Sequence, residues 1–535
     1  MPLVSGALDA PRSSTENLDA APLSKLDLPL AILIAMEICF LALIVTKAID
    51  WPYADDFVYI DWLQEFRDGK PIWQFWMDAH VASHPLGTQA IFAIYVFRIL
   101  GLHFSYLIYA SALAIIASQL LIYQAFRQSS AAKRILVVIV TSIAFFHPIQ
   151  SKHIFWAFEL GWYFVNLFMI LNVILVEKKY RLSWLFAIAS CILASFSSAQ
   201  GVFTWAALAL HVFLVPSFGR RWLTIAVSLI GLLLSIAHLK YLSTYFDNAN
   251  TSVSLEIYIP YVIKLLGSAF ANRSDIVTLT LGGGMICVMF LLGFAMWRAR
   301  PLTPNLRIGG VLIVGSVLCL AAFAVGRADF GFSWVASHFH VGPMLVPLIL
   351  GISLVCVELL FLPRIGIWLK LPILASLLFV CSSFIPAFQF GQVEVREGVE
   401  ERQVAKWSLC DGRFPETVSA SLNLSIQHID LYRRTVPFIK QLCTGTIDER
   451  TRRIFEFPAL FESMATEKPD ARPALIDLWT AYIVHGDLRH AFSIDDSDYA
   501  KKLLSFATAN ARSGSKYDSD LLAPHSAYFL EVGKE

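Results

Sequence analysis

LPLAILIAMEICFLALIVTKAIDWPYADDFVYID, residues 28–61, joins an apolar run to a stretch rich in acids and aromatic residues. The run from 28 to 47 is long enough for a membrane helix, which needs about 20 consecutive apolar residues. The adjacent acids Asp55 and Asp56 follow almost directly, and Asp61, Asp68 and Asp78 come soon after. The first membrane helix is therefore predicted to lead straight into an unusually acidic loop.

The composition of the whole chain agrees with this first run. Of 535 residues, 57% are hydrophobic and 16% are charged, and the mean hydropathy is +0.61. Soluble domains carry about 25% charged residues. The chain is therefore predicted to be an all-α polytopic membrane protein. Its net charge of +1 offers no basic face for nucleic acid.

Apolar runs bounded by charges or turn residues predict about eleven membrane helices. The predicted spans are 28–48, 104–126, 134–150, 160–176, 183–199, 201–217, 222–242, 276–297, 308–326, 341–362 and 367–388. Residues 1–27 lack the basic start and apolar core of a cleavable signal peptide, so we expect a disordered tail and a retained first helix. The shorter apolar stretch 86–101 is predicted to be an interfacial helix, because counting it as a span would violate the charge rule.

Lys and Arg set the predicted orientation, because cytoplasmic loops carry an excess of them. Four basic loops fall on one side: 127–134, 177–181, 219–221 and 298–307. The other side holds 51–103, 151–159, 243–275 and 327–340, which are richer in acids, His and aromatic residues. The N-terminus is therefore predicted to be cytoplasmic, and the large first loop, 49–103, extracytoplasmic.

The region 389–535 is more polar and contains no run long enough to span a membrane. Helical periodicity in it predicts a small α-rich extracytoplasmic domain after a transmembrane module at 28–388. Cys410 and Cys443 are candidates for a disulfide there, with two free thiols as the alternative. The eight cysteines show no spacing typical of a zinc site.

The order of features in the first loop resembles the GT-C superfamily of polyprenyl-phosphate-sugar-dependent glycosyltransferases. The similarity is to the branch that contains protein O-mannosyltransferases and the lipid A aminoarabinose transferase. Asp55-Asp56 stands at the acidic pair of that branch, Tyr59 follows it, and His84-Pro85-Leu86 stands at its His-Pro motif. Gly101 closes the surface helix. The second acid is Asp where the family usually has Glu, and Leu86 replaces a second Pro.

The resemblance implies a GT-C-like bundle in which Asp55 is the general base for the incoming hydroxyl. Asp56 would support it or help to hold a cation, and Tyr59 and His84 would belong to the substrate site. Adjacent side chains diverge, so the two acids need not face one pocket. The alternative for an Asp-Asp pair is that it only caps or solvates the loop.

Transfer from a lipid phosphate also needs cations for the departing phosphate. Arg327, at the extracytoplasmic end of a predicted span, is the first candidate, and a snorkelling interfacial anchor is its alternative reading. Arg273, Lys152 and Lys264 are weaker candidates. A divalent cation, Mg²⁺ or Mn²⁺, is left open, with ligands sought among His80, Asp78, His84, His338 and His340.

These features predict an enzyme that moves a sugar from a polyprenyl-phosphate donor to a glycan, lipid or protein acceptor, without nucleic acid. The predicted location is a bacterial inner membrane. Two alternatives remain: a flippase or transporter of lipid-linked sugars, and a protein like the O-antigen ligases or polymerases. Transporters usually carry functional charges near the membrane midplane, where this chain has few, Glu37 and Glu358 being the exceptions.

Overall fold

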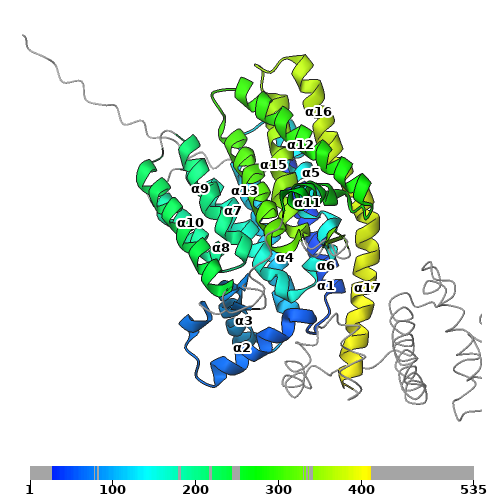
Figure 1. Ribbon diagram of the computed structural model, residues 1–535. Coiled ribbons are helices and arrows are strands. Elements are labelled where there is room, and N and C mark those ends of the chain that lie inside the picture. Colours follow the sequence, from blue (N-terminus) through cyan, green and yellow to red (C-terminus); the bar gives the residue numbers. More distant parts are fainter. Residues whose placement is uncertain are drawn as a thin grey trace, which may run out of the picture.

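The computed structural model describes residues 27–76, 79–80, 84–178, 182–215, 218, 220–243, 254–328, 331–332, 335–336 and 341–410. This part of the chain is a bundle of helices, with one short strand pair, β1 (Ala79–His80) and β2 (His84–Pro85). The bundle is seen from the side in Figure 1, where α2 (Phe57–Arg67) and α3 (Gly87–Leu100) lie together at one end. We call this the α2–α3 end of the bundle.

Nine helical segments of the described residues are long and apolar enough to cross a membrane. Five of them are single helices: Leu28–Lys47 (α1), Ser105–Ala125 (α4), Asp275–Arg298 (α12), Pro304–Arg327 (α13) and Gly342–Phe361 (α15). A sixth, Arg221–Leu242, is most of α10 (Arg221–Ser243). The other three each join two elements: Ala131–Ile154 contains α5 (Ala131–Phe145) and α6 (Ser151–Ile154), Ala157–Lys178 contains η4 (Ala157–Glu159) and α7 (Leu160–Lys178), and Ile367–Val395 contains α16 (Ile367–Ser382) and the start of α17 (Phe384–Cys410). The prediction of an all-α polytopic membrane protein is therefore confirmed.

Two of the eleven predicted spans correspond to shorter helices. The predicted segments 183–199 and 201–217 contain α8 (Ser183–Ser195) and α9 (Phe203–Leu214), which are 13 and 12 residues long. Both pack within the bundle, α8 against α7 and α9 against α10. At about 1.5 Å per residue neither helix alone reaches across a hydrocarbon core of about 30 Å.

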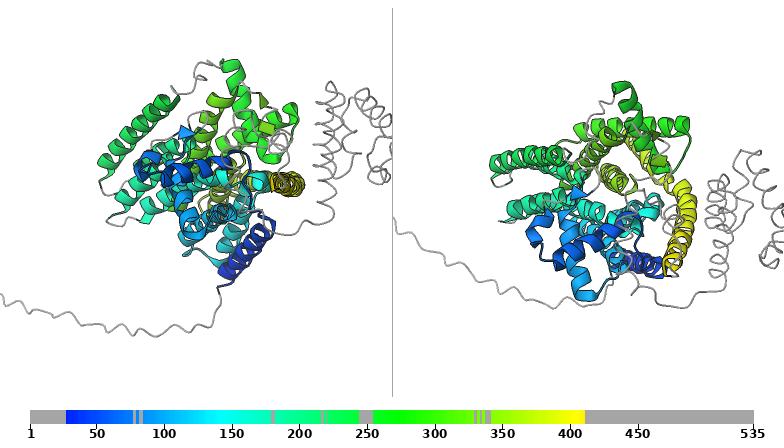
Figure 2. Two further views of the ribbon diagram at one scale, coloured as in Figure 1. Left: turned by 90° about the horizontal axis from the view of Figure 1, so that it is seen from below. Right: turned by 60° about the horizontal axis from the view of Figure 1, so that its bottom comes forward.

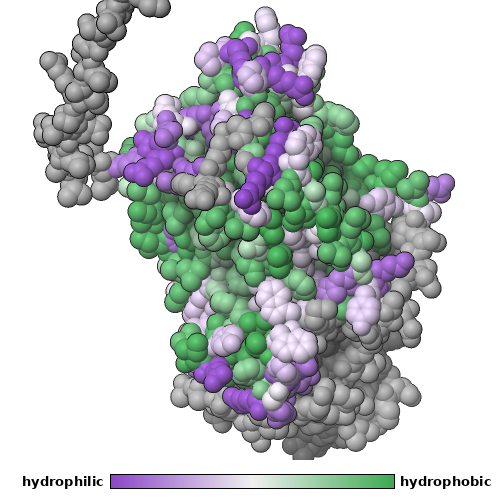
Figure 3. All heavy atoms as spheres, turned by 90° about the vertical axis from the view of Figure 1, so that its left-hand side faces the viewer, coloured by the Kyte–Doolittle hydropathy of each residue, from purple (hydrophilic) through white to green (hydrophobic). Residues whose placement is uncertain are grey.

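The distribution of exposed apolar side chains fits a membrane environment. An apolar belt covers the face in Figure 3, between hydrophilic residues near its two ends. On α10, which runs along the edge of the bundle in Figure 2, Leu233 is 67% exposed, and Phe290 of α12 is 76% exposed. The helix α15, by contrast, is buried over nearly its whole length among α13, α5 and α16. The bundle thus has an apolar interior and an apolar perimeter.

The segment 86–101 contains the helix α3, which at 14 residues is not among the nine long segments; its predicted position at the membrane interface stays a prediction. It packs on α2 and on the turn η2 (Ile72–Trp76). Its start needs Gly87, because a Cβ there would lie 2.6 Å from the Cα of Trp76. Its end needs Gly101, whose φ of +92° is rarely adopted by other residues.

The predicted loop 243–275 contains a short helix. The helix α11 (Leu255–Gly267) lies inside the predicted 243–275 loop and packs against α12. The two backbones approach closely because both contact points are glycines. A Cβ on Gly267 would lie 1.9 Å from the carbonyl oxygen of Thr278, and one on Gly282 would lie 1.8 Å from that of Ile263.

The last helix crosses the predicted boundary between the membrane module and the C-terminal domain. The chain turns at Ser383, and α17 then continues through residue 389 to Cys410. Figure 1 shows α17 beside the bundle, reaching the level of α2 and α3. The predicted C-terminal domain lies otherwise outside the described residues, as does Cys443, the predicted partner of Cys410.

At the opposite end of the bundle, buried ion pairs join helix ends. The carboxylate of Glu358 on α15 accepts hydrogen bonds from Lys133 at 2.5 Å, Asn305 at 3.0 Å and Thr303 at 3.0 Å. Glu177 of α7 binds Arg307 through two nitrogens, at 2.8 and 2.7 Å, and also contacts His211. These charges are compensated locally, so Glu358 has a structural role.

Candidate functional site

The acidic pair lies in a single helical turn, η1 (Ala54–Asp56), directly before α2. The backbone N–H of Tyr53 donates to the carboxyl of Asp56 at 2.9 Å, which closes the turn from within. This bond turns Asp56 inward, where it is 1% exposed, whereas Asp55 is half-buried. The two acids therefore occupy different environments, as expected for adjacent side chains.

Asp56 holds the first loop against two other parts of the chain. Its second oxygen accepts a hydrogen bond of 2.6 Å from the backbone N–H of Phe158 in η4. Burial raises the pKa of Asp56 to about 8, while the hydrogen bonds from Tyr53 and Phe158 and the charge of Arg402 favour the ionised form. Because both oxygens bind backbone groups of the protein, the contacts of Asp56 are those of a structural residue.

Arg402 of α17 completes this structural contact. Its guanidinium is buried, lies 4.9 Å from the ring centroid of Tyr53, and donates a hydrogen bond to the carbonyl oxygen of Phe155. The indole N–H of Trp156 donates to the carbonyl oxygen of Tyr53 at 3.1 Å. The start of the first loop, residues 155–158 and α17 are thus locked together. Sequence reasoning missed Arg402, because it falls in the region assigned to the C-terminal domain.

Asp55 lies in a second group of polar residues. Its charge interacts with Arg327, the last residue of α13, and with the phenol of Tyr59. Arg327 also interacts with Tyr261 of α11, whose pKa burial raises and whose hydroxyl has no hydrogen-bond partner among the described residues. Three elements far apart in sequence, η1, α11 and α13, therefore place an acid and a hydroxyl within electrostatic range of one cation.

Tyr59 interacts with an acid of each group, Asp56 and Asp55. Its hydroxyl donates to the carbonyl oxygen of Ala157 at 3.4 Å, and its ring is 1% exposed. Burial and the negative charges of Asp56, Glu159 and Asp55 hold its pKa well above the ordinary value. Tyr59 therefore stays protonated and can only act as a neutral hydrogen-bonding group.

Glu159 is a third acid of this region that sequence reasoning did not single out. It is buried, its Oε1 lies 3.4 Å from Nδ1 of His153, and its Oε2 has no hydrogen-bond partner among the described residues. Its position in the segment 151–159, predicted to lie on the same side as Asp55, was the available signal. A single acid in a short loop gave no reason to prefer it.

The other predicted cations have partners of their own. Lys152 is buried, with its ammonium 6.0 Å from the ring centroid of Tyr53. Arg273 lies 3.7 Å from Glu394 of α17, and Lys264 lies 2.7 Å from Asp275. Arg327 interacts electrostatically with Asp55.

The predicted metal ligands lie largely outside what the structure describes. His84 and His80 are opposite each other in the β1–β2 pair, where their backbones are described. Asp78, His338 and His340 lie outside the described residues. Within the described part of the chain, no group of three or more His, Cys, Asp or Glu side chains is arranged to hold a metal ion. A divalent cation therefore stays a prediction.

Comparisons with known proteins give no relative for this chain: no family model, no curated protein and no solved structure matches it.

Proposed function

We propose that the protein is a membrane glycosyltransferase that takes a sugar from a polyprenyl-phosphate donor on its extracytoplasmic side. The α2–α3 end of the bundle would be that side, as the distribution of Lys and Arg predicts. The acceptor would be a hydroxyl group of a glycan, a lipid or a protein. The observation that carries the proposal is that Asp55, the residue at the position of the base in the resembling family, is half-buried on η1 and within electrostatic range of Arg327 at the end of α13.

In the proposed reaction, the acceptor hydroxyl attacks the anomeric carbon of the donor sugar. The bond between that carbon and the phosphate oxygen breaks, and polyprenyl phosphate leaves with the electron pair. Asp55 accepts the hydroxyl proton as general base. Arg327 neutralises the charge that builds up on the departing phosphate, for which a guanidinium is well suited. Tyr261 supplies a further hydrogen bond to the sugar or the phosphate.

The two acids have separate roles in this proposal. Asp55 is half-buried, so a substrate can reach it, whereas Asp56 uses both oxygens to hold Tyr53 and Phe158. Asp56 would position the turn on which Asp55 is carried. This division matches the resemblance, in which the first acid of the pair is the base.

The placement of the buried charges supports an enzyme over a transporter. Glu358 and Glu177 form ion pairs at the end of the bundle opposite to Asp55, and neither lies free along a pathway. Glu37 is the exception, since it is buried in α1 and its carboxyl oxygens have no hydrogen-bond partner among the described residues.

The test is a turnover assay with purified protein in lipid bilayers and a panel of polyprenyl-phosphate sugars. We expect sugar-dependent release of polyprenyl phosphate with at least one donor, and its loss in Arg327→Gln. Arg298→Gln is the matched control and should retain turnover, because Arg298 is the last residue of α12 and lies at the end of the bundle away from α2 and α3. Scrambling of the lipid between leaflets without release of polyprenyl phosphate would contradict the transferase proposal and favour a flippase.

A further inference from the structure

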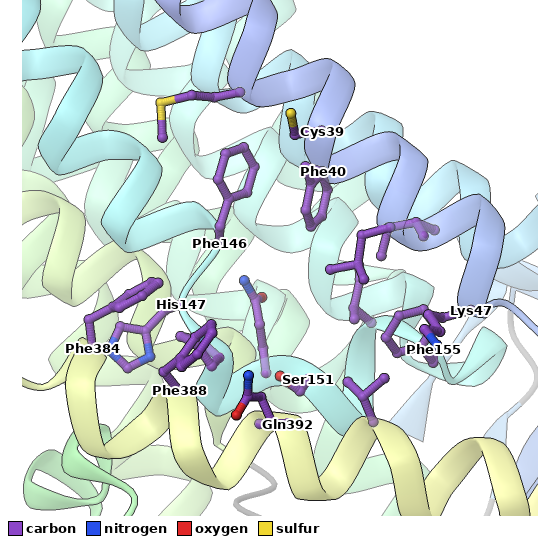
Figure 4. Close-up of a pocket in the computed structure, with 18 of the residues that line it drawn as sticks. Cys39, Phe40, Lys47, Phe146, His147, Ser151, Phe155, Phe384, Phe388 and Gln392 are labelled. Atoms are coloured by element: carbon purple, nitrogen blue, oxygen red, sulfur yellow. The ribbon is translucent and has the colours of Figure 1, made fainter.

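A large apolar cavity lies between α1 and α17 (Figure 4). Its volume is about 930 Å³, near the upper end of the ~300–1,000 Å³ typical of ligand pockets. α1 packs on α4 and α5, whereas α17 packs on α6 and on the turn η3 (Pro148–Gln150). The two long helices thus form opposite walls, and residues 146–155 form the floor.

The chemistry of the lining changes along the cavity. The part far from the α2–α3 end is lined by Cys39 and by the rings of Phe40, Phe146, Phe384 and Phe388 (Figure 4). Polar side chains follow on the floor and on α17: Gln150, Ser151 and Gln392. The ammonium-bearing Lys47 lies at the α2–α3 end. The order is therefore aromatic, then polar and uncharged, then cationic.

Gln150 contributes a buried amide to the polar part of the cavity wall. Its side chain is 4% exposed, and its amide nitrogen donates to the carbonyl oxygen of Phe145. Its amide oxygen has no hydrogen-bond partner among the described residues. A buried acceptor without a donor costs free energy, and the floor of the cavity carries this acceptor just beneath its surface.

The length of the cavity matches one leaflet of a bilayer. Its wall on α1 runs from Ala35 to Lys47, thirteen residues that span about 18 Å at 1.5 Å rise per residue. One leaflet contributes about half of a hydrocarbon core of about 30 Å. A chain of ordinary acyl length therefore fits, whereas a polyprenyl chain is much longer.

The cavity is open to the surroundings of the bundle but walled off from Asp55. On its rim, Leu43 is 47% exposed and Phe388 is 46% exposed, as expected beside lipid. At the α2–α3 end Arg402 bonds the carbonyl of the lining residue Phe155 and packs on Tyr53. The lining does not include Asp55, Tyr59 or Arg327.

We propose that this cavity is a binding site for an anionic glycerophospholipid of the leaflet at the α2–α3 end. One acyl chain lies among the phenylalanines, the glycerol region contacts Gln150, Ser151 and Gln392, and the phosphate pairs with Lys47. The aromatic, polar and cationic parts of the lining follow one another in the same order as the acyl chain, glycerol and phosphate of such a lipid. The inference does not depend on the transfer reaction, because the site is separate from Asp55.

The bound lipid would also fix α17. Phe384, Phe388 and Gln392 lie on the first turns of α17, and Arg402 lies further along the same helix. A lipid wedged between α1 and α17 would therefore hold Arg402 on Phe155 and Tyr53. Lipid binding would in this way stabilise the turn that carries the acidic pair.

The test is native mass spectrometry of the full-length protein, stripped of lipid and titrated with phosphatidylglycerol or with phosphatidylcholine of the same chains. We expect one tightly held phosphatidylglycerol per protein. Leu43→Trp, which fills the cavity, should weaken this binding about tenfold or more, since a displaced chain loses its apolar contacts. Val45→Trp is the matched control, because Val45 is 52% exposed on the same helix and does not line the cavity.

A second pair of variants tests the charge. Lys47→Gln should lower the preference for phosphatidylglycerol over phosphatidylcholine about fivefold, the effect of one Lys near a membrane surface. Lys240→Gln, in the last turn of α10, should leave it unchanged. The proposal is overturned if Leu43→Trp binds as wild type does, or if wild type holds no lipid because a segment of the chain fills the cavity. Displacement of the phospholipid by polyprenyl phosphate would also overturn it, since the cavity would then belong to the donor.

Discussion

Replacing each acid of the pair by its amide should separate structure from chemistry at the candidate site. Asp56 accepts hydrogen bonds from two buried N–H groups, those of Tyr53 and Phe158. An amide offers one acceptor oxygen, and its NH₂ group would face the second N–H. Loss of a bond to a buried donor costs about 1–3 kcal/mol, so Asp56→Asn should be less stable than wild type by that amount at about pH 4, where the titration of Asp56 does not yet lower the stability of the wild type.

Asp55→Asn is the matched control, one residue away with the same change of chemistry. Its carboxyl is half-buried, whereas that of Asp56 is buried, so we expect the smaller change, with the stability of Asp55→Asn within about 0.5 kcal/mol of wild type. The assay is thermal unfolding of both variants in detergent with lipid, followed by tryptophan fluorescence. One kcal/mol moves the midpoint by about 2–4 °C in domains of 150–250 residues, so Asp56→Asn should melt a few degrees lower. Equal midpoints for wild type and Asp56→Asn would refute the structural role.

The same variant tests the ionisation of Asp56. Burial raises the pKa of this carboxyl from 3.8 to about 8, so the native state binds its proton more tightly than the unfolded chain does. The resulting stability is fully present below about pH 4 and is lost as the pH rises through about 8. Between about pH 5 and pH 9 the wild type should therefore lose more stability than Asp56→Asn. Parallel pH profiles would contradict a raised pKa.

The remaining predictions concern the helices around the site. Lys133→Met leaves the buried Glu358 without its counter-charge and should lower the free energy of unfolding by about 3–5 kcal/mol. The double variant Lys133→Met/Glu358→Met should recover most of that loss. A double variant as unstable as Lys133→Met would argue against the ion pair. Glu37→Met removes a buried carboxyl that has no hydrogen-bond partner among the described residues, and so removes a desolvation cost of about 1–3 kcal/mol. The unfolding midpoint should therefore rise. A lower midpoint would mean that Glu37 has a partner beyond the described residues. Gly282→Ala should lower both the unfolding midpoint and sugar transfer, because its Cβ would push α11 and Tyr261 away. Gly283→Ala is the control, since its Cβ meets nothing within 4 Å, and should keep both. Equal behaviour of the two variants would show that the close approach of α11 and α12 is unimportant.

The membrane helices could be read from the sequence, because long apolar runs leave few alternatives in lipid. The helix α11 was not predicted, because it is short, contains Pro260 and lies inside a predicted loop between two membrane helices. The course of α17 across residues 388–389 was not predicted either, because Ser383 bends the chain without ending the helical course. The length and composition of an apolar run do not show where tertiary packing places a short helix or a bend.

The candidate site could be predicted only in part. The resemblance selected Asp55, and the charge rule together with helix ends selected Arg327 as a residue on the same side. The separate role of Asp56 depends on hydrogen bonds to residues about a hundred positions away, and the role of Arg402 on packing against Tyr53 and Phe155. Contacts of this kind depend on the tertiary fold, and a single sequence carries no local pattern for them.

The most direct test of the proposed function compares wild type with Asp55→Asn in the release of polyprenyl phosphate from a polyprenyl-phosphate sugar. Both proteins should be reconstituted in the same lipid mixture and checked for equal unfolding midpoints. We expect turnover in wild type and its loss in Asp55→Asn, because an amide cannot accept the proton of the acceptor hydroxyl. Equal turnover by the two proteins would contradict the assignment of Asp55 as the general base.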